Sequence, residues 1–271
     1  MASSILSCTG ALSALGCLLI AMSPVQATAG DFIFADDFSD PGPGPTQSCA
    51  VSPDSNGFFT LTSALSNYAV RLPPAYEVAN PRPSRLLVAL HGCGDNAMNF
   101  ATWAAVPFAL RAKQNYIAIS VGGRDGACWS LSTDAALVAA AIAHVRSCFY
   151  VHQERIVLGG YSSGGGLAYK LAMTDALTYA GVLIEHSSLT SAVGSSNVDA
   201  ALNAAGWKLN IGHTAGINDE VYSIDEVHSD QAKILAHGFP MQFREDASDH
   251  NGSSSDWSDY LIPLMANWTL P

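Results

Sequence analysis

The stretch that decides the fold is Arg155-Ile156-Val157-Leu158-Gly159-Gly160-Tyr161-Ser162-Ser163-Gly164, continued by Gly165-Gly166-Leu167-Ala168. Its apolar first part predicts a short buried strand, and its last part predicts the start of a helix. Ser162 then occupies a tight, strained turn, in which glycines at 160 and 164 let strand and helix approach closely. The pattern G-x-S-x-G in this context indicates a serine nucleophile. The alternative is a glycine-rich turn in which Ser162 has no chemical role.

Strand and helix patterns alternate on both sides of this stretch. Short apolar runs predict strands at residues 68–72, 86–90, 116–120, 156–158, 180–184, 209–211 and 241–243. Helical patterns occupy residues 100–113, 132–148, 224–237 and 257–268, with Ser132 or Thr133 as the N-cap of the second. This alternation predicts an α/β fold with a mostly parallel central sheet and helices on both faces. Active sites in such sheets lie beyond the carboxyl ends of the strands.

The N-terminal segment is predicted to be removed before the protein matures. Residues 11–22 form an apolar run, followed by small-x-small sequences that end at Ala27 and at Ala29. We interpret residues 1–29 as a secretory signal peptide, although the first ten residues contain no Lys or Arg. A retained anchor is the alternative. Residues 30–57 are predicted to be a Pro-, Gly- and Ser-rich tail and residues 58–271 one catalytic domain. A secreted or periplasmic location follows.

The charge of the chain restricts its partners. The sequence has 12 Lys and Arg against 23 Asp and Glu, a net charge of −11. An acidic surface argues against nucleic acid and anionic membranes as partners, whereas a neutral ester or sugar is compatible with it. The apolar run at residues 11–22 is too short for a comfortable membrane span, so we expect no stable insertion. The sequence leaves the oligomeric state open.

Cysteine usage is consistent with export. Two of the six cysteines lie in the predicted signal peptide, and the others are Cys49, Cys93, Cys128 and Cys148. Four cysteines in an exported chain suggest two disulfides with three possible connectivities. Cys93 and Cys128 both follow predicted strands at the same end of the sheet. The favoured pairs are therefore Cys93 with Cys128 and Cys49 with Cys148.

A serine nucleophile needs a base, and five histidines follow Ser162 in the sequence: His186, His213, His228, His237 and His250. His250 lies in a polar loop after the last predicted strand, where the base is expected in the order serine, acid, histidine. His186 and His213 are expected to end strands and are alternative bases or pocket residues. His228 and His237 fall in a predicted helix and are expected to be surface or packing residues.

The acid that would orient the base is expected at Asp219. This residue lies in a loop between a predicted strand and a predicted helix. Glu220 and Asp225 are close competitors, and any single acid on an acidic protein can be an ordinary solvated charge. The role of Asp219 would be to hold the His250 tautomer and stabilise its protonated form.

An oxyanion hole is expected from the loop His91-Gly92-Cys93-Gly94, which follows an apolar strand. The backbone N–H of Cys93 and that of Ser163 would be its donors. His91 is expected to shape this loop, as a hydrogen-bonded core histidine, rather than to act as a catalyst. His91, Trp129 and Tyr161 are candidate substrate-binding residues, and each aromatic ring could equally belong to the core.

These segments together resemble a known family. The stretches LLVALHGCGDN, CWSLSTDAALVAAAIAHV and ERIVLGGYSSGGGLAYKLA, with the Asp219 and His250 loops in that order, resemble secreted α/β-hydrolase esterases. The resemblance is to the feruloyl esterase and polyhydroxybutyrate depolymerase group and covers about residues 68–268. It implies Ser162 as nucleophile, Asp219 as acid, His250 as base and the loop at residues 91–94 as oxyanion donor. The family signature H-G-x-x-D-x-x-V-P is replaced here by Asn218-Asp219-Glu220-Val221-Tyr222, which keeps the competing acids open.

The function expected from this combination is hydrolysis of carboxylic esters through an acyl-enzyme, without a metal or an organic cofactor. Feruloyl esters, acetylated polysaccharide and hydroxyalkanoate polyesters are the expected substrate types. A serine peptidase or acyltransferase on the same fold is the nearest alternative, because the pocket rather than the triad selects the acceptor. A non-catalytic binding protein that kept the fold is the alternative from another class.

Overall fold

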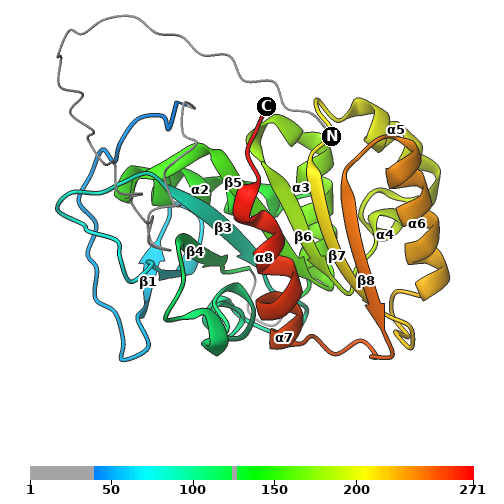
Figure 1. The fold of residues 1–271 in the computed structure, drawn as a ribbon, viewed down its shortest axis with the longest axis horizontal. Coiled ribbons are helices and arrows are strands. Elements are labelled where there is room, and N and C mark those ends of the chain that lie inside the picture. The colour runs from blue at the N-terminus through cyan, green and yellow to red at the C-terminus, as the bar shows by residue number, and fades with distance from the viewer. Residues whose placement is uncertain (1–39, 124–126) are drawn as a thin grey trace, which may run out of the picture. The chain divides into compact units, whose positions relative to one another are not determined.

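An eight-stranded sheet forms the centre of the computed structural model, which describes residues 40–123 and 127–271 (Figure 1). Its strands are β1 (Phe58–Thr62), β2 (Asn67–Arg71), β3 (Ser84–Leu90), β4 (Tyr116–Val121), β5 (Val151–Tyr161), β6 (Gly181–Glu185), β7 (Asn210–Gly216) and β8 (Met241–Asp246). Their order is β1-β2-β4-β3-β5-β6-β7-β8. Strand β2 is antiparallel to both its neighbours, and every other pair is parallel. The prediction of a mostly parallel sheet is confirmed.

The middle of the sheet is buried on both faces, as the continuous apolar run in β3 predicts. Leu86 and Val88 point into one hydrophobic cluster, whereas Leu87 and Ala89 point into a second cluster on the opposite face. Successive side chains of a strand alternate between faces, so one uninterrupted run supplies both cores.

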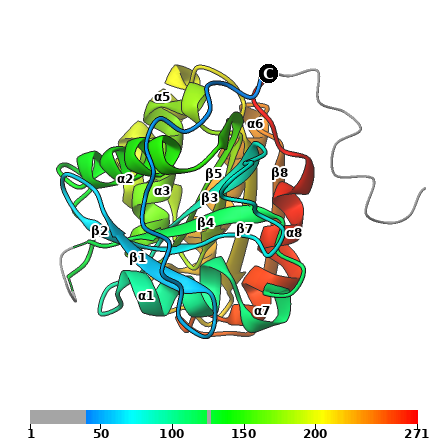
Figure 2. The ribbon, with the colours of Figure 1, turned by 90° about the vertical axis from the view of Figure 1, so that its left-hand side faces the viewer.

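Helices cover both faces of the sheet. They are α1 (Ala97–Phe100), α2 (Ala135–Cys148), α3 (Ser163–Thr174), α4 (Leu189–Val193), α5 (Val198–Ala204), α6 (Ile224–Ala236), α7 (Ser254–Asp256) and α8 (Ile262–Leu264). Figure 2 shows α2 and α3 on one side of the strands and α7 and α8 on the other. Val138 and Leu167 belong to the first cluster, and Trp257 and Ile262 belong to the second.

The helix predicted at residues 100–113 is wrong in its length and regularity. After α1 the chain forms a π-helical turn at Ala101–Ala105 and then a 3-10 turn at Phe108–Leu110. Val106 leaves the helical region, with φ −140° and ψ 75°. The cause is Pro107, because proline lacks an N–H and disfavours helical geometry at the residue before it.

Two further helix predictions need correction. Helix α2 has Asp134 as its N-cap rather than Ser132 or Thr133, and the Asp134 Oδ2 accepts the Ser130 N–H at 2.8 Å in the turn before the helix. The region 257–268 is divided into a π-helical turn at Trp257–Leu261, α8 and a 3-10 turn at Met265–Asn267. Helices α4 and α5, between β6 and β7, were not predicted.

The residues before β1 are bound to the domain. Cys49 forms a disulfide with Cys148 at the end of α2, and the N–H groups of Thr46 and Gln47 donate to the carbonyl of Ser147. Residues 40–57 therefore belong to the same compact unit as the sheet. The predicted signal peptide lies outside the described residues, and no described helix combines the length and apolar character needed to cross a membrane.

Candidate active site

Ser162 lies in a strained turn between β5 and α3. Its φ of 53° and ψ of −121° are unusual for a residue other than glycine. A Cβ on Gly164 would lie 2.1 Å from the Leu90 carbonyl oxygen, and one on Gly160 would lie 2.3 Å from that of Gly164. Both positions therefore exclude a side chain. The close approach lifts Ser162 to the carboxyl edge of the sheet, where its N–H donates to the Glu185 carbonyl at 3.0 Å.

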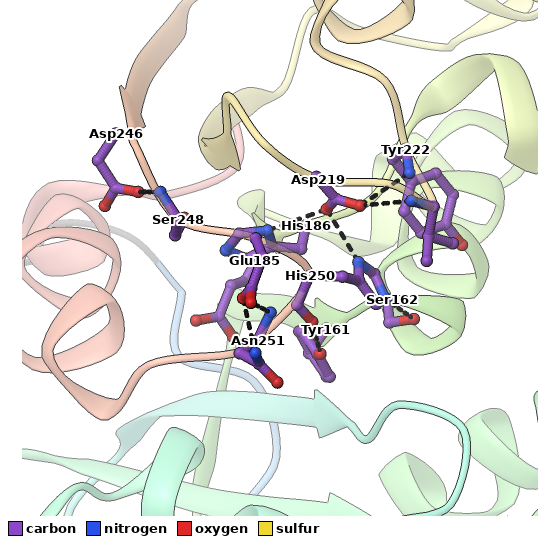
Figure 3. Close-up of polar contacts among 12 residues, drawn as sticks. Tyr161, Ser162, Glu185, His186, Asp219, Tyr222, Asp246, Ser248, His250 and Asn251 are labelled. Atoms are coloured by element: carbon purple, nitrogen blue, oxygen red, sulfur yellow. Dashed lines mark hydrogen bonds and ion pairs between the residues drawn. The ribbon is translucent and has the colours of Figure 1, made fainter.

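Three side chains from separate loops meet at this edge (Figure 3). The Nε2 of His250 is 2.9 Å from the Oγ of Ser162, and the Nδ1 of His250 is 2.8 Å from the Oδ2 of Asp219. Ser162 is 6% exposed, and the His250 side chain is 24% exposed. The imidazole therefore bridges a hydroxyl and a carboxylate at a position that solvent can reach.

Asp219 is held as an anion in a largely buried position. Its Oδ1 accepts the N–H groups of Val221 and Tyr222 at 2.8 and 2.9 Å. Burial acts to raise the pKa of Asp219, but the hydrogen bonds from His250, from the two amides and from His186 outweigh it and leave the pKa below its usual value. The competing acids Glu220 and Asp225 are exposed.

The other histidines have partners of their own. His186 follows β6 directly. Its Nδ1 is 3.1 Å from the Oδ2 of Asp219, so Asp219 contacts a second imidazole besides that of His250. His213 lies inside β7 rather than at its end, buried with its Nδ1 2.9 Å from the Tyr169 hydroxyl. His228 and His237 pair with Glu245 and Asp199 at the surface.

The loop after β3 lies directly against Tyr161 and Ser162. A Cβ on Gly92 would come within 2.6 Å of the Tyr161 ring and 3.4 Å of the Ser162 Cβ. Gly94 has a φ of +82°, and Cys93 between them forms a disulfide with Cys128. Ser163 is the first residue of α3, where N–H groups have no partner within the helix.

His91 and Trp129 support this loop from behind. Both residues are buried, with their ring centroids 5.0 Å apart. The Trp129 indole N–H donates to the His91 carbonyl at 2.7 Å, and the Nδ1–H of His91 donates to the Gly92 carbonyl at 2.8 Å. Their placement favours a supporting role over contact with a substrate.

Tyr161 and Tyr222 enclose the His250 ring. Tyr161 stacks on it with a centroid distance of 5.5 Å, and its hydroxyl donates to the His250 carbonyl. Tyr222 lies 5.5 Å away at a tilt of 44°. Burial raises the pKa of Tyr222. Tyr222 was not singled out from the sequence as a site residue. It is a neighbour of Ser162 and occupies the valine position of the family signature.

Glu185, at the end of β6, anchors the loop that carries His250. Its Oε1 accepts the Ser253 N–H and its Oε2 accepts the Trp257 indole N–H, both at 2.7 Å. Burial raises the pKa of Glu185 to about 8, although these two hydrogen bonds act to lower it. This residue was also missed from the sequence, because a single acid at the end of an apolar strand carries no recognisable pattern.

Three clusters of described residues bring possible metal ligands within 4.8 Å of one another, and two of them lie at the site: His186 with Asp219 and His250, and Glu185 with His186 and Asp256. In the first cluster the imidazole nitrogens nearest Asp219 already have its carboxylate as a hydrogen-bond partner. Hydrogen bonding therefore explains that arrangement without an ion. The third cluster, Cys49 with His144 and Cys148, contains the disulfide described above.

Comparison with known proteins places the fold. No protein-family model matches the sequence, and no curated protein matches it significantly. Among solved structures, a substrate-bound fluorophosphonate-binding serine hydrolase of Staphylococcus aureus is similar at a TM-score of 0.63 and 15% identity, over 83% of this chain and all of the other. A ferulic acid esterase is similar at a TM-score of 0.58 and 18% identity, over 77% and 95% of the two chains.

A third similar structure is a CE1 ferulic acid esterase from Anaeromyces mucronatus in complex with ferulic acid. Its TM-score is 0.61 at 14% identity, over 78% of this chain and 89% of the other. At these identities the likeness establishes the fold. The chain has the α/β-hydrolase fold, as its resemblance to esterases of that group implies.

Proposed function

We propose that this protein is a serine hydrolase of carboxylic esters, with Ser162 as nucleophile, His250 as base and Asp219 as orienting acid. One observation carries the proposal. A single imidazole lies 2.9 Å from a hydroxyl on a strained turn and 2.8 Å from a buried carboxylate. Hydrogen-bond distances of this kind let a histidine take a proton from serine while an acid stabilises the resulting imidazolium.

In the first half of the reaction, His250 Nε2 takes the Ser162 proton as Oγ attacks the ester carbonyl. The carbonyl oxygen becomes an oxyanion, which we expect the N–H groups of Cys93 and Ser163 to bind. The C–O bond then breaks, and the protonated His250 returns its proton to the leaving alcohol. Ser162 keeps the acyl group.

In the second half, a water molecule enters from the exposed side of His250. His250 removes a proton from this water, which attacks the acyl carbonyl through the same oxyanion position. The carboxylic acid leaves and Ser162 regains its proton. Asp219 stays ionised throughout, in agreement with the hydrogen bonds that lower its pKa.

The proposed substrates are feruloyl esters, acetylated polysaccharides or hydroxyalkanoate polyesters. Two similar folds belong to ferulic acid esterases, one of them in complex with ferulic acid, and this favours the first class. Export is part of the proposal. The disulfides Cys49–Cys148 and Cys93–Cys128 support it, because such bonds persist in oxidising compartments.

A substrate panel tests this function. Methyl ferulate, acetylated xylan, hydroxybutyrate oligomers and short nitrophenyl esters would be supplied to the purified protein, to Ser162→Ala and to Ser229→Ala, a control at an exposed serine in α6. We expect hydrolysis of at least one class by the unchanged protein and by the control, and a loss of at least about 10⁵-fold in kcat for Ser162→Ala. Equal turnover by Ser162→Ala would contradict the proposal, and amide cleavage or acyl transfer without ester hydrolysis would redirect it.

A further inference from the structure

His186 is a buried histidine that the proposed reaction does not use. It follows β6 with a φ of 48°, in the left-handed region that few residues other than glycine, asparagine, aspartate and histidine adopt. Its N–H donates to the Thr214 carbonyl at 3.0 Å, and the residue is 2% exposed. The surrounding structure therefore imposes a strained backbone on a residue whose side chain points at the triad (Figure 3).

The Nδ1 of His186 and the Nδ1 of His250 contact the same atom, the Oδ2 of Asp219, at 3.1 and 2.8 Å. The other oxygen of Asp219 accepts two backbone amides. An ionised carboxylate offers about four acceptor positions, so these four donors saturate it. Because a carboxylate accepts hydrogen bonds, the Nδ1 of His186 must carry a proton toward it.

The groups that face His186 come from several elements. Asp246 at the end of β8 and Asp256 in α7 are close enough for its charge to act on the pKa of each, and Arg244 pairs with Asp256. His213 in β7 and Glu185 in β6 are its further titratable neighbours. Its ring meets the edges of two site rings, those of His250 at 6.0 Å and Tyr161 at 6.2 Å.

We propose that His186 is a positioning residue that gives Asp219 a second imidazole N–H, which fixes the carboxylate and weakens its attraction for the proton on His250. This inference rests on the proposed function. A hydrogen bond to a carboxylate spreads its negative charge, so the His250 imidazolium gains less from Asp219 when His186 is present. The acidic limb of the kcat/KM profile then lies at lower pH than it would with Asp219 alone.

The sign of the effect does not depend on the charge of His186. A neutral ring withdraws negative charge from Asp219 through its N–H, and a protonated ring would do so more strongly. Removal of the ring therefore moves the acidic limb of the kcat/KM profile to higher pH in both cases. A residue that only filled space would change stability and leave the profile where it was.

Two substitutions separate the lost donor from the strained backbone. His186→Gly removes the N–H and tolerates a positive φ, whereas His186→Asn also tolerates it and keeps an amide N–H near the original Nδ1. His237→Ala is the matched control. It removes a histidine that lies at the C-terminal end of α6, outside the proposed site, and pairs with Asp199. For His186→Gly we expect an upward shift of the acidic limb by about 0.5 to 1 pH unit and a loss of about tenfold in kcat with little change in KM.

For His186→Asn we expect a profile within about 0.3 pH unit of the unchanged protein, and for His237→Ala an unchanged profile. Equal profiles for His186→Gly and the unchanged protein, or equal shifts for His186→Gly and His186→Asn, would overturn the proposal. Thermal unfolding of each variant identifies losses of activity that are caused by misfolding. If His186→Gly does not fold, the profile of His186→Asn and the spectroscopic measurement below test the proposal.

A measurement without turnover keeps this inference separate from the proposed function. Long-range ¹H–¹⁵N correlation spectra of the unchanged protein report which imidazole nitrogen is protonated. We expect the Nδ1–H form of His186 and a ¹³C carboxyl shift of Asp219 that changes in His186→Gly but is restored in His186→Asn. A protonated Nε2 with a bare Nδ1 would overturn the role of His186, even in an active esterase. Absence of esterase activity with the expected spectra would instead contradict the proposed function.

Discussion

At the scale of single residues, we expect Asp219 to decide how well the proposed site works. Its buried carboxylate receives two imidazoles on one oxygen and two backbone amides on the other. Such an acid orients the base and stabilises its protonated form, and its negative charge matters more than its shape. The exposed neighbours Glu220 and Asp225 lack this position.

Replacement of Asp219 by Asn tests this assignment. The amide keeps the volume but loses the charge, and its NH₂ group faces N–H donors that need an acceptor. We expect kcat to fall by about 10³- to 10⁴-fold, less than for Ser162→Ala. Steady-state kinetics on the best ester of the panel measures the loss. Full activity would transfer the acid role to Glu220 or Asp225.

The residues of the proposed triad could be singled out from the sequence because each has a local signal. Ser162 is flanked by glycines, and Asp219 and His250 lie in polar loops after strands. Glu185 and Tyr222 could not be assigned to this network from sequence, and His186 was expected only as an alternative base or pocket residue. Their contacts join positions about 30 to 70 residues apart, and the side-chain directions that make those contacts depend on the strand register.

At the scale of elements, the contact between β5 and α3 determines where Ser162, the proposed nucleophile, lies. Gly160 and Gly164 face backbone atoms, so nothing there can move aside for a side chain. Gly166, two positions further along α3, has only ordinary contacts, at 3.8 Å from the Ser187 Oγ and 3.9 Å from the Leu131 Cδ2. Gly164 and Gly166 therefore have different reasons to be in this helix.

Gly164→Ala and Gly166→Ala form a matched pair in one helix. A Cβ 2.1 Å from the Leu90 carbonyl oxygen must push strand and helix apart, so we expect Gly164→Ala to cost at least about 3 kcal/mol of unfolding free energy and to abolish activity. For Gly166→Ala we expect a change between zero and a gain of about 1 kcal/mol, with activity retained. Denaturant unfolding with an activity assay measures both, and equal losses in the pair would contradict this explanation.

The strands could be predicted better than the helices. The continuous apolar runs of β3 and β4 are typical of strands buried on both faces. The helix predicted at residues 100–113 was wrong because Pro107 interrupts it, and the short α4 and α5 were missed because five and seven residues are too few for a clear period.

At the scale of the whole molecule, buried acids set the pH dependence of stability. Burial raises the pKa of Glu185 to about 8 from a usual value of 4.5, and it also raises the pKa values of Asp230 and Asp256. A group that binds its proton more tightly when folded makes the folded state less stable as pH rises through that interval. Asp219 and Asp246 have lowered pKa values, so their contribution is lost only in stronger acid.

We therefore expect the unfolding free energy to be lower at pH 8 than at about pH 5, and the lowered pKa of buried His213 opposes this decrease only below about pH 6.5. Each unit by which a folded-state pKa is raised corresponds to about 1.4 kcal/mol over the full interval. Glu185→Gln removes the acid whose pKa is raised to about 8, so it should reduce the difference in unfolding free energy between pH 5 and pH 8. Urea unfolding of both proteins at the two pH values measures this. A stability that rises toward pH 8 in the unchanged protein would be the contrary result.

The order of strands across the sheet could not be derived from the sequence in the same way. The alternation of strands and helices predicts a parallel sheet, but the exchange of β3 and β4 and the antiparallel β1 and β2 depend on connections far apart in the chain. The carboxyl edge of the sheet nevertheless gathers Ser162, Asp219 and His250 from three different strand ends. The proposed function depends on this convergence.

Covalent labelling tests the central claim most directly. A fluorophosphonate reacts with a serine only where a base and an oxyanion hole activate it. We expect intact-mass analysis to show a single adduct on the unchanged protein, peptide mapping to place it on Ser162, and Ser162→Ala to remain unlabelled. An unlabelled but folded protein, or an adduct that persists in Ser162→Ala, would contradict the account.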